Sequence, residues 1–411
     1  MRLDGYEGGV APPAVASSRT ILIAGAGIGG LTAALALTRA GYRVVITEQA
    51  DALSDVGAGI QLSPNATRIL QEFGVAERLA ATAVVPEGLS IRSARSGSQI
   101  AYMPIGRAME FRYGAPYWML HRGDLQAALA DRVSEQPDVV LKLGTRLEDF
   151  AVHAKGITAQ LRDARGVTDE RVPALIGADG LWSAVRAQLG DKTKPVFRDR
   201  TAWRALLPAS AVPDEMRRPV TRLWLGRNAH LVHYPVRGGT LINVVAIVAD
   251  RWNSPGWSAP GARDELLRHF TRERWAKPAR DLIDMPDKWV KWALFDRNDP
   301  GFPDRGPATL IGDAAHPMLP FLAQGAAMAI EDAAILARCL ASPGADPEPG
   351  MRRYEAIRRA RVRRVQHEAR ANSRAYHMSG PAALARNLAM RMMGGERLRA
   401  RYDWIYDWRP D

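Results

Sequence analysis

The stretch from residue 20 to residue 48 constrains the fold more strongly than any other part of this sequence. Apolar and β-branched residues at 20–24 predict a strand, Gly25-Ala-Gly-Ile-Gly-Gly30 predicts a tight turn, and 31–40 predict a helix that Gly41 ends. A second strand, 43–47, ends at Glu48, which lies 18 residues after the last glycine of the turn. A GxGxxG pattern in this βαβ setting predicts a dinucleotide-binding fold.

The turn has the composition of a pyrophosphate-binding loop. Its glycines let the backbone approach the anion closely, and the helix that follows directs its positive N-terminal end toward it. Glu48 can accept hydrogen bonds from the ribose of an adenosine, which favours FAD or NAD over a cofactor with a 2′-phosphate. The dinucleotide-binding residues expected here are Gly25, Gly27, Ile28, Gly29, Gly30 and Glu48.

A second unusual stretch, GDAAHPMLPFLAQGAAMAIEDA, occupies 312–333. An apolar run at 308–311 ends at Gly312-Asp313, and a proline-interrupted loop follows. Small residues at 325–327 then begin a helix, although helices usually begin with polar residues. An acid at a strand end beside a helix start without bulky side chains leaves the backbone open to a ligand.

The remaining pattern predicts an α/β body that a region poor in helices interrupts. Strands are expected at 202–207, 222–225, 230–236 and 241–248, and a helical segment is expected from 324 to about 376. We therefore expect an α/β fold with a β-sheet domain inserted into a dinucleotide-binding domain. The expected boundaries are a mobile leader at 1–18, a discontinuous cofactor domain at 19–86, 110–180 and 296–375, a β-rich substrate domain at 87–109 and 181–295, and a helical, aromatic tail at 376–411.

Four motifs occur in one order along the chain: GxGxxG with Glu48, HRxDL at 121–125, GADG at 177–180, and GDAAHPMxPxxAQGAAMAIEDA from residue 312. Together they resemble the group A flavin-dependent aromatic hydroxylases, with the closest likeness to the salicylate, 3-hydroxybenzoate and 6-hydroxynicotinate hydroxylases. The resemblance extends over about residues 19–375. It implies a GR2-type, Rossmann-like FAD-binding domain with an inserted β-sheet substrate domain and a C-terminal helical segment.

The resemblance also implies the reaction and further cofactor contacts. NADH or NADPH reduces non-covalently bound FAD, and O2 then gives a flavin 4a-hydroperoxide that hydroxylates an electron-rich aromatic ring. In the family, the residue matching Asp313 holds the ribityl and pyrophosphate part of FAD, and the backbone at 325–327 faces the pyrimidine end of the flavin. The further cofactor-binding residues that we expect are Gly59, Arg122, Asp179, Asp313, Gly325, Ala326 and Ala327.

The strand at 230–236 supplies the candidate catalytic residues. Because alternate residues of a strand share a face, His230 and Tyr234 point one way and His233 points the other. The hydroxybenzoate and hydroxynicotinate members contact substrate with a His and a Tyr at this spacing. Four strand residues span about 13 Å, so two long side chains can reach either end of one ring. The resemblance therefore assigns His230 and Tyr234 to catalysis.

Three further residues are expected to line the substrate pocket: Gln61, Pro320 and Phe321. The hydroxynicotinate hydroxylases are expected to have histidines where this chain has Gln61 and Phe321. These departures favour a hydroxylated aromatic acid of the salicylate or 3-hydroxybenzoate type, with 6-hydroxynicotinate as the alternative. Arg204 and Arg222 are both candidates for binding the substrate carboxylate.

Composition excludes several other classes of site. The single cysteine, Cys339, excludes a disulfide framework and fits the cytoplasm, and the eight histidines show no metal-binding spacing, so no metal is expected. The net charge of +12 is concentrated at 351–374, where nine arginines occur with one aromatic residue and no nucleic-acid motif. We interpret that stretch as a long helix with a solvated arginine face, and we expect Arg358 to have no part in FAD binding.

The expected partners follow from these points: a small aromatic acid, no nucleic acid and no integral membrane contact, in a monomer or a homodimer. The uncharged stretch at 21–38 carries four glycines, so a strand, turn and helix explain it better than a membrane span. The aromatic tail at 402–408 is expected to pack on the long helix or to form a dimer contact. Two other readings stay open, namely an FAD dehydrogenase or oxidase without oxygen insertion, and a basic protein that binds nucleic acid or membrane.

Overall fold

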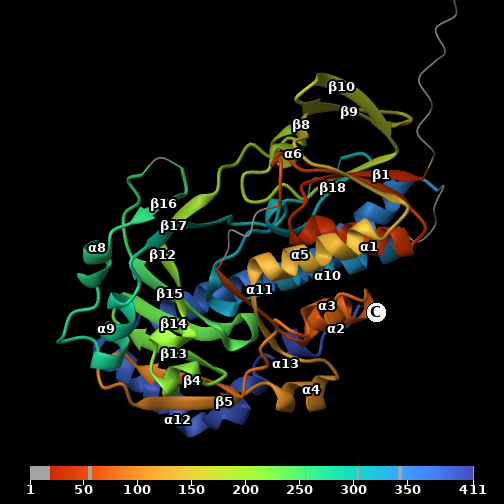
Figure 1. Cartoon of the computed structure of the whole chain (residues 1–411). Coiled ribbons are helices and arrows are strands. Elements are labelled where there is room, and N and C mark those ends of the chain that lie inside the picture. Colours follow the sequence, from red (N-terminus) through yellow and green to blue (C-terminus); the bar gives the residue numbers. More distant parts are fainter. Residues whose placement is uncertain (1–18, 54–57, 255, 303–304, 341–344, 411) are drawn as a thin grey trace, which may run out of the picture.

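The computed structural model describes residues 19–53, 58–254, 256–302, 305–340 and 345–410. The expected leader at 1–18 lies outside the described residues. The α/β class is confirmed, because a parallel sheet covered by helices is joined to a large, mostly antiparallel sheet (Figure 1). Within the described ranges, no helix combines the length and the apolar character that crossing a membrane requires.

A five-stranded parallel sheet forms the cofactor-side body. Its strands are rich in Ile, Leu, Val and Ala, and all but the edge strand at 139–142 are largely buried, as expected for a parallel sheet covered on both faces. In spatial order they are β18 (Ala308–Leu310), β11 (Ala174–Gly177), β1 (Thr20–Ala24), β2 (Arg43–Thr47) and β7 (Val139–Lys142). The helices α1 (Ile28–Arg39), α5 (Arg122–Ser134) and α10 (Gly325–Cys339) lie side by side next to this sheet (Figure 1).

Helix α1 begins at Ile28, three residues earlier than the sequence pattern predicts. Two glycines therefore lie inside a helix, where glycine is usually unfavourable. Tertiary contacts explain them: a Cβ on Gly29 would lie 3.3 Å from Ala329 of α10, and a Cβ on Gly30 would lie 2.0 Å from the carbonyl oxygen of Gly25. Close packing, which is invisible in a local pattern, decides the first turn of this helix.

The second large element is an eight-stranded sheet. It gathers strands from 88–104 and from 196–296, which matches the expected interruption of the α/β body by a β-rich region. In spatial order the strands are β16 (Ser258–Gly261), β17 (Trp289–Asp296), β12 (Val196–Pro208), β15 (Leu241–Ala249), β14 (Ala229–Val236), β13 (Val220–Gly226), β4 (Gly88–Ser93) and β5 (Gln99–Pro104).

The two faces of this sheet have different neighbours. The face that carries Trp203, Trp224 and Leu231 packs on α8 (Arg263–Leu267) and α9 (Lys277–Asp284), and we call it the outer face. The opposite face carries Ala202 and Ile247 and packs on the loop around Leu319 and on helix α11, and we call it the inner face. Smaller elements complete the fold: the ribbon of β3 (Gly59–Leu62) and β6 (Trp118–His121), the hairpin sheet β8 (Arg146–His153), β9 (Gly156–Asp163) and β10 (Gly166–Val172), and the helices α2 (Pro64–Glu72), α3 (Ala76–Leu79), α4 (Arg107–Tyr113), α6 (Ala184–Gln188) and α7 (Asp214–Arg217).

The end of the chain is helical from Gly325, as expected, and the predicted helical segment at 324–376 contains two helices. Helix α10 ends at Cys339, and the long α11 (Pro347–Tyr376) then runs beside it toward the large sheet (Figure 1). Helix α12 (Gly380–Ala400) lies along β5, and the short α13 (Asp403–Tyr406) follows. The expected packing of the aromatic tail on the long helix is confirmed, because Trp404 and Trp408 lie over arginine side chains of α11.

The expected solvated arginine face on this helix is wrong at one important position. Arg358 is fully buried and forms ion pairs with Glu331 and Asp332 of α10. A buried guanidinium is tolerated only when carboxylates compensate its charge, and two carboxylates do so here. Arg358 is therefore part of the joint between α10 and α11 and not a surface residue.

Candidate active site

Glu48 lies directly against the glycine turn. One oxygen of its carboxylate accepts a hydrogen bond from the backbone N–H of Ala26 at 3.0 Å, and the other accepts one from Ala50 at 3.0 Å. The turn is fixed from the other side, because the N–H of Gly25 donates to the carbonyl of Thr47 at 2.7 Å. These contacts bring together the expected pyrophosphate loop and the expected ribose acceptor.

The glycines of the turn are required for different reasons. Gly25 has φ +107°, and a Cβ there would lie 2.5 Å from the carbonyl oxygen of Ala178, so the GADG turn presses against the first turn of the fold. A Cβ on Gly27 would meet no atom of the described structure within 4 Å. Packing within the protein therefore does not explain Gly27, whereas the close approach of a ligand would.

One carboxylate oxygen of Asp179, in the GADG motif, makes a structural hydrogen bond, and the other has no hydrogen-bond partner. Its Oδ2 accepts the N–H of Val185 at 3.0 Å, at the start of α6, while Oδ1 is buried without a hydrogen-bond partner. Burial raises the pKa of this carboxyl, and hydrogen bonds from Ser183 and the α6 backbone oppose the shift. The structural role that Asp-Gly turns often have is thus present, but it uses only one of the two oxygens.

Asp313 and the start of α10 form the second part of the site. The side chain of Asp313 is exposed although Gly312 and Ala314 on either side are buried. Helix α10 begins at Gly325 without a side-chain cap and without an acidic residue in its first turn. Among the described residues, no hydrogen bond is made to the first-turn N–H groups at 325–327, so this helix presents unpaired donors.

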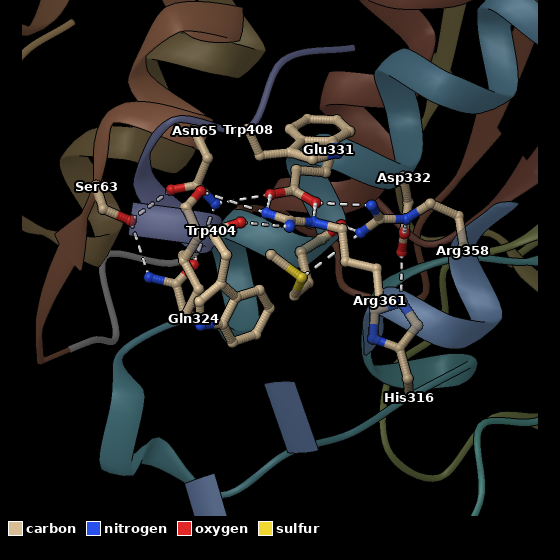
Figure 2. Close-up of polar contacts among 12 residues, drawn as sticks. Ser63, Asn65, His316, Gln324, Glu331, Asp332, Arg358, Arg361, Trp404 and Trp408 are labelled. Atoms are coloured by element: carbon tan, nitrogen blue, oxygen red, sulfur yellow. Dashed lines mark hydrogen bonds and ion pairs between the residues drawn. The ribbon is translucent and has the colours of Figure 1, made fainter. Parts of the chain in front are cut away.

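A buried polar network holds these two parts in place (Figure 2). Asp332 accepts the N–H of Gly312 at 2.9 Å, binds His316 Nε2 at 2.5 Å and accepts from Arg358 Nε at 2.6 Å. Although burial acts in the opposite direction, the charges of His316 and Arg358 lower the pKa of Asp332 to about 2. Asp332 therefore ties both ends of the 312–316 turn to α10 and so positions Asp313.

The network extends to the N-terminal end of α10. Glu331 accepts hydrogen bonds from Arg358, Arg361 and Asn65, each at 2.7 Å. Gln324 donates to Ser63 Oγ at 2.8 Å (Figure 2). Side chains from α2, α10 and α11 thus meet at the N-terminal end of α10, and sequence reasoning found none of these contacts.

The expected catalytic pair lies on the inner face of the large sheet. His230 packs against Phe321, with ring centroids 5.4 Å apart, and Tyr234 lies near Gly59 of β3. His233 points to the outer face, where it stacks on Trp224 with centroids 6.4 Å apart. The predicted sides of β14 are therefore correct, and the inner face meets both the ribbon β3–β6 and the loop before α10.

The tautomer of His230 follows from its hydrogen bonds. Its Nδ1 lies 2.9 Å from Nε2 of His377, and Nδ1 of His377 lies 2.7 Å from the main-chain oxygen of Ser373. That oxygen can only accept, so His377 carries its proton on Nδ1 and, when neutral, accepts at Nε2. His230 must then donate from Nδ1, and its Nε2 keeps a lone pair. Burial, with the charges of His377 and Arg200, lowers the pKa of His230, which keeps it neutral.

Tyr234 is held by a second set of contacts. It hydrogen-bonds to Gln61, and the Oε1 of Gln61 accepts from the hydroxyl of Tyr117 at 2.9 Å. Burial raises the pKa of Tyr234, an effect that Arg204 partly opposes, so the phenol stays protonated. Gln61 is thus brought to the catalytic pair as expected, and two tyrosines fix its orientation.

Gly59 is explained by contacts with the large sheet. Its N–H donates to Asn243 Oδ1 at 2.7 Å, and a Cβ at this position would lie 2.6 Å from Asn243 and 2.7 Å from Tyr234. A larger residue would push the ribbon away from the inner face. Asn243, which the sequence did not indicate, keeps its Nδ2 buried without a partner.

The sheet register separates the two arginines considered for the carboxylate. Arg222 pairs with His233 across β13 and β14, so it belongs to the outer face. Arg204 pairs with Val245, which pairs with Val232, so it belongs to the inner face with His230 and Tyr234. Arg204 Nε is buried without a hydrogen-bond partner, and its charge acts on Tyr234. Of the two candidates, Arg204 is therefore the one that shares a face with the expected catalytic pair.

The remaining predicted residues lie at the same junction. Phe321 is buried against His230 and His377, and Pro320 begins the short 3-10 turn that carries it. Arg122, the first residue of α5, is exposed, and its charge acts on both Asp313 and Arg204. Arg122 therefore lies between the cofactor-side residues and the inner face.

Comparison with known proteins agrees with this arrangement. A family model described as an FAD binding domain matches residues 18–369. The 3-amino-4-hydroxybenzoate 2-monooxygenase PtnB3 of Streptomyces platensis is 37% identical over 389 residues, which cover 94% of this chain and 95% of that protein. The chain belongs to the FAD-dependent aromatic hydroxylases.

Two further proteins align with nearly the whole of this chain. A 3-hydroxybenzoate 6-hydroxylase of Polaromonas naphthalenivorans (strain CJ2) is 36% identical over 389 residues, with 94% of this chain and 96% of that protein covered. A salicylate hydroxylase solved as a substrate complex superposes with a TM-score of 0.80 at 26% identity, over 95% of this chain and 96% of that one. The hydroxylase fold predicted from the four motifs is therefore confirmed, together with the monooxygenase class and the cofactor FAD.

Three features of this hydroxylase fit FAD. The position of Gly27 leaves space where a side chain would stand, Asp313 offers an exposed carboxylate, and the first turn of α10 offers unpaired N–H groups. A helix N-terminus stabilises negative charge, which reduced flavin carries near its pyrimidine edge. When bound, FAD supplies the electron transfer and the oxygen activation that no amino-acid side chain provides.

Proposed function

We propose that this monooxygenase hydroxylates a small hydroxylated aromatic acid of the salicylate or 3-hydroxybenzoate type, with NADH or NADPH as the reductant. The observation that carries the proposal is the combination of His230, Tyr234 and Arg204 on one face of the sheet. A neutral base, a protonated phenol and an uncompensated cation suit a ring that bears both a hydroxyl and a carboxylate. Phe321 adds an apolar wall for the ring.

In this proposal each residue has a defined task. Arg204 binds the substrate carboxylate, and Nε2 of His230 accepts the proton of the ring hydroxyl, which makes the ring more electron-rich. Tyr234 remains protonated and donates to the substrate, with Gln61 holding its orientation. His377 keeps the lone pair of His230 on Nε2. The ribbon β3–β6 and the 319–322 loop cover the inner face and exclude water from the reacting ring.

We propose that FAD is held by the residues identified in the sequence. The glycine turn and Ile28 receive the pyrophosphate, Glu48 the ribose, and Asp313 the ribityl and pyrophosphate region. The backbone at 325–327 receives the flavin edge, while Arg122 and Asp179 contribute from the sides. Gly59 acts indirectly, since its contacts with Asn243 and Tyr234 set the distance between the ribbon and the sheet.

The alternative substrate, 6-hydroxynicotinate, has less support, because Gln61 and Phe321 occupy the positions where histidines are expected for it. The aromatic carboxylate reading is tested by a screen of hydroxybenzoates and hydroxypyridines with the FAD-loaded enzyme. NAD(P)H oxidation, oxygen uptake and hydroxylated product are measured together. One oxygen consumed per hydroxylated benzoate supports the proposal. Substrate-dependent NAD(P)H oxidation without any oxygenated product would indicate a dehydrogenase or oxidase instead.

We also propose the domain boundaries expected from the sequence, a cytoplasmic location, and a monomer or a homodimer.

We further propose that the basic stretch at 351–374 binds no nucleic acid. This is supported by the use of its arginines inside the molecule: Arg358 and Arg361 pair with Glu331, and Arg364 lies 3.7 Å from the ring centre of Trp404.

A further inference from the structure

A cavity of about 240 Å³ lies on the outer face of the large sheet, on the side away from His230 and Tyr234. It is lined by side chains of β4, α7 and β13 and by the start of α9, including Arg92, Glu215, Arg222 and Trp224. The strand register places Arg92, Arg222 and Trp224 on one face of the sheet. Arg92 pairs with Trp224 across β4 and β13, and Arg222 pairs with His233 across β13 and β14. None of these residues belongs to the proposed active site.

Two residues that line the cavity carry buried hydrogen-bond donors that have no partner among the described residues. Arg222 is 5% exposed and Trp224 is 2% exposed. Arg222 Nη1 and Trp224 Nε1 are both buried without a hydrogen-bond partner in the described structure. Most buried polar groups in proteins are paired, so two unpaired donors at one cavity indicate a missing acceptor.

The charge around the cavity is only partly compensated. Arg222 donates from Nη2 to the main-chain oxygen of Glu215, but no carboxylate among the described residues lies within ion-pair distance of it. The guanidinium carbon of Arg92 lies 5.1 Å from the centre of the Trp224 ring, and the one carboxylate within ion-pair distance of Arg92 among the described residues is that of Glu215, at 3.8 Å. The Glu215 side chain is 71% exposed, so its charge is largely screened by water.

His233 stacks on Trp224, which lines the cavity, and supplies no negative charge. It is fully buried, and neither of its ring nitrogens has a hydrogen-bond partner. Burial, together with the charges of Arg222 and Arg92, lowers the pKa of His233 to about 3, so the ring is neutral at pH 7. Water molecules could satisfy the donors but could not balance the two guanidinium charges, which an anion can do.

We propose that this cavity is a second ligand site, which binds a small oxyanion, either a phosphate or a carboxylate, between Arg92, Arg222 and the indole N–H of Trp224. Its volume accommodates a ligand several times larger than a water molecule, which occupies about 30 Å³ in the liquid. Guanidinium groups bind phosphate and carboxylate oxygens with charge-assisted hydrogen bonds, and the indole adds a directed donor. The site is independent of the substrate class proposed for the inner face.

The indole N–H of Trp224 provides a direct probe of this site. The FAD-loaded enzyme is labelled with ¹⁵N at its eleven tryptophan indoles, and Trp224→Phe identifies the Trp224 resonance. Inorganic phosphate and benzoate are titrated in separate experiments, with chloride keeping the ionic strength constant. We expect a saturable shift of the Trp224 resonance with at least one of them. The ion that saturates the shift distinguishes phosphate from carboxylate as the bound group.

Three variants separate this site from the active site. Arg222→Gln and Arg92→Gln should each weaken the binding about ten- to a hundred-fold, the loss expected for one charge-assisted hydrogen bond. Arg92 is partly exposed, so its variant tests the site even if Arg222→Gln fails to fold. Arg204→Gln should leave the binding unchanged. The proposal is overturned if neither ion gives a saturable shift, if the arginine variants bind as well as wild type, or if Arg204→Gln abolishes the shift.

Discussion

Nδ1 of His230 lies 2.9 Å from Nε2 of His377, and this contact joins the inner face of the large sheet to the end of α11. Because His377 donates its own Nδ1 proton to Ser373, the direction of the whole chain of hydrogen bonds is fixed. The lone pair of His230 is left on Nε2. A remote histidine thus determines which nitrogen of the proposed base can accept a proton.

Loss of His230 should uncouple the reaction. His230→Ala is expected to oxidise NAD(P)H with substrate present but to release hydrogen peroxide, because base contributions of this kind are about 10²–10⁴-fold. Product and peroxide are quantified per NAD(P)H consumed. His233→Gln on the outer face is the matched control and should stay coupled. If the control uncouples and His230→Ala does not, the catalytic face has been assigned wrongly.

His377 should act through His230 rather than on substrate. His377→Phe removes the acceptor at Nε2 and is expected to lower the coupled rate about ten-fold, whereas His377→Gln keeps an acceptor oxygen and should recover most of it. The dependence of coupling on pH should change in the Phe variant and not in the Gln variant. Equal loss in both variants, with an unchanged pH profile, would indicate a purely structural role.

Arg204 should determine the affinity for the carboxylate. Arg204→Gln is expected to raise the KM for a hydroxybenzoate about ten- to a hundred-fold, since one charge-assisted hydrogen bond is lost, and to leave the KM for the corresponding uncharged phenol nearly unchanged. Steady-state kinetics with the two substrates measure the difference. Arg222→Gln lies on the outer face and should change neither value. A carboxylate preference that survives Arg204→Gln would contradict this assignment.

The cofactor assignments predict a loss of FAD affinity. Glu48→Ala and Asp313→Ala should each weaken FAD binding about ten- to a hundred-fold, measured by fluorescence of the released flavin on dilution. Arg363→Ala is a suitable control because this arginine is exposed on α11, where it pairs with the exposed Asp299. Arg358→Ala, expected from the sequence to be neutral, cannot serve, since Arg358 is buried in the network behind Asp313. Equal retention in all variants except Arg358→Ala would remove these assignments.

The buried network should be a major source of stability. Asp332→Asn leaves Arg358 with one carboxylate partner and weakens the contacts to His316 and Gly312, so we expect a destabilisation of about 3–5 kcal/mol in urea unfolding. The contribution of Asp332 to the free energy of unfolding should depend on pH. The pKa of Asp332 is about 2 when folded, below the ordinary value, so its contribution is complete above about pH 4 and is lost as the pH falls toward 2. If Asp332→Asn is as stable as the wild type at pH 7, the network does not have this role.

His233 should make the protein sensitive to milder acid. Its pKa is lowered to about 3 in the folded state, so between about pH 6.5 and 3 the unfolded chain binds a proton that the folded chain does not. Stability should therefore fall as the pH falls, by up to about 1.4 kcal/mol per pH unit from this residue alone. His233→Leu should reduce the slope of unfolding free energy against pH by about one proton. An unchanged slope would show that His233 is not buried as a neutral group.

Sequence by itself determined the parts of this protein that depend on local pattern. Strand, glycine turn and helix follow one another in the order expected of a dinucleotide-binding fold, and the period of two in β14 separates His230 and Tyr234 from His233. The small residues at the start of α10 likewise indicated an open backbone, because their lack of side chains is a local property.

Tertiary structure alone decided which distant groups meet these patterns. His377 is 147 residues from His230, and no local periodicity encodes that pairing. Alternation placed Arg204 and Arg222 on definite faces of their strands, but only the register of the whole sheet showed that Arg204 shares the face of His230 and Tyr234 and that Arg222 does not. Arg358 lies in a stretch that looks like a solvated helix, and its burial depends on two carboxylates of a separate helix. A pattern of residues fixes which side chains share a face, whereas the packing of remote segments fixes what that face contacts.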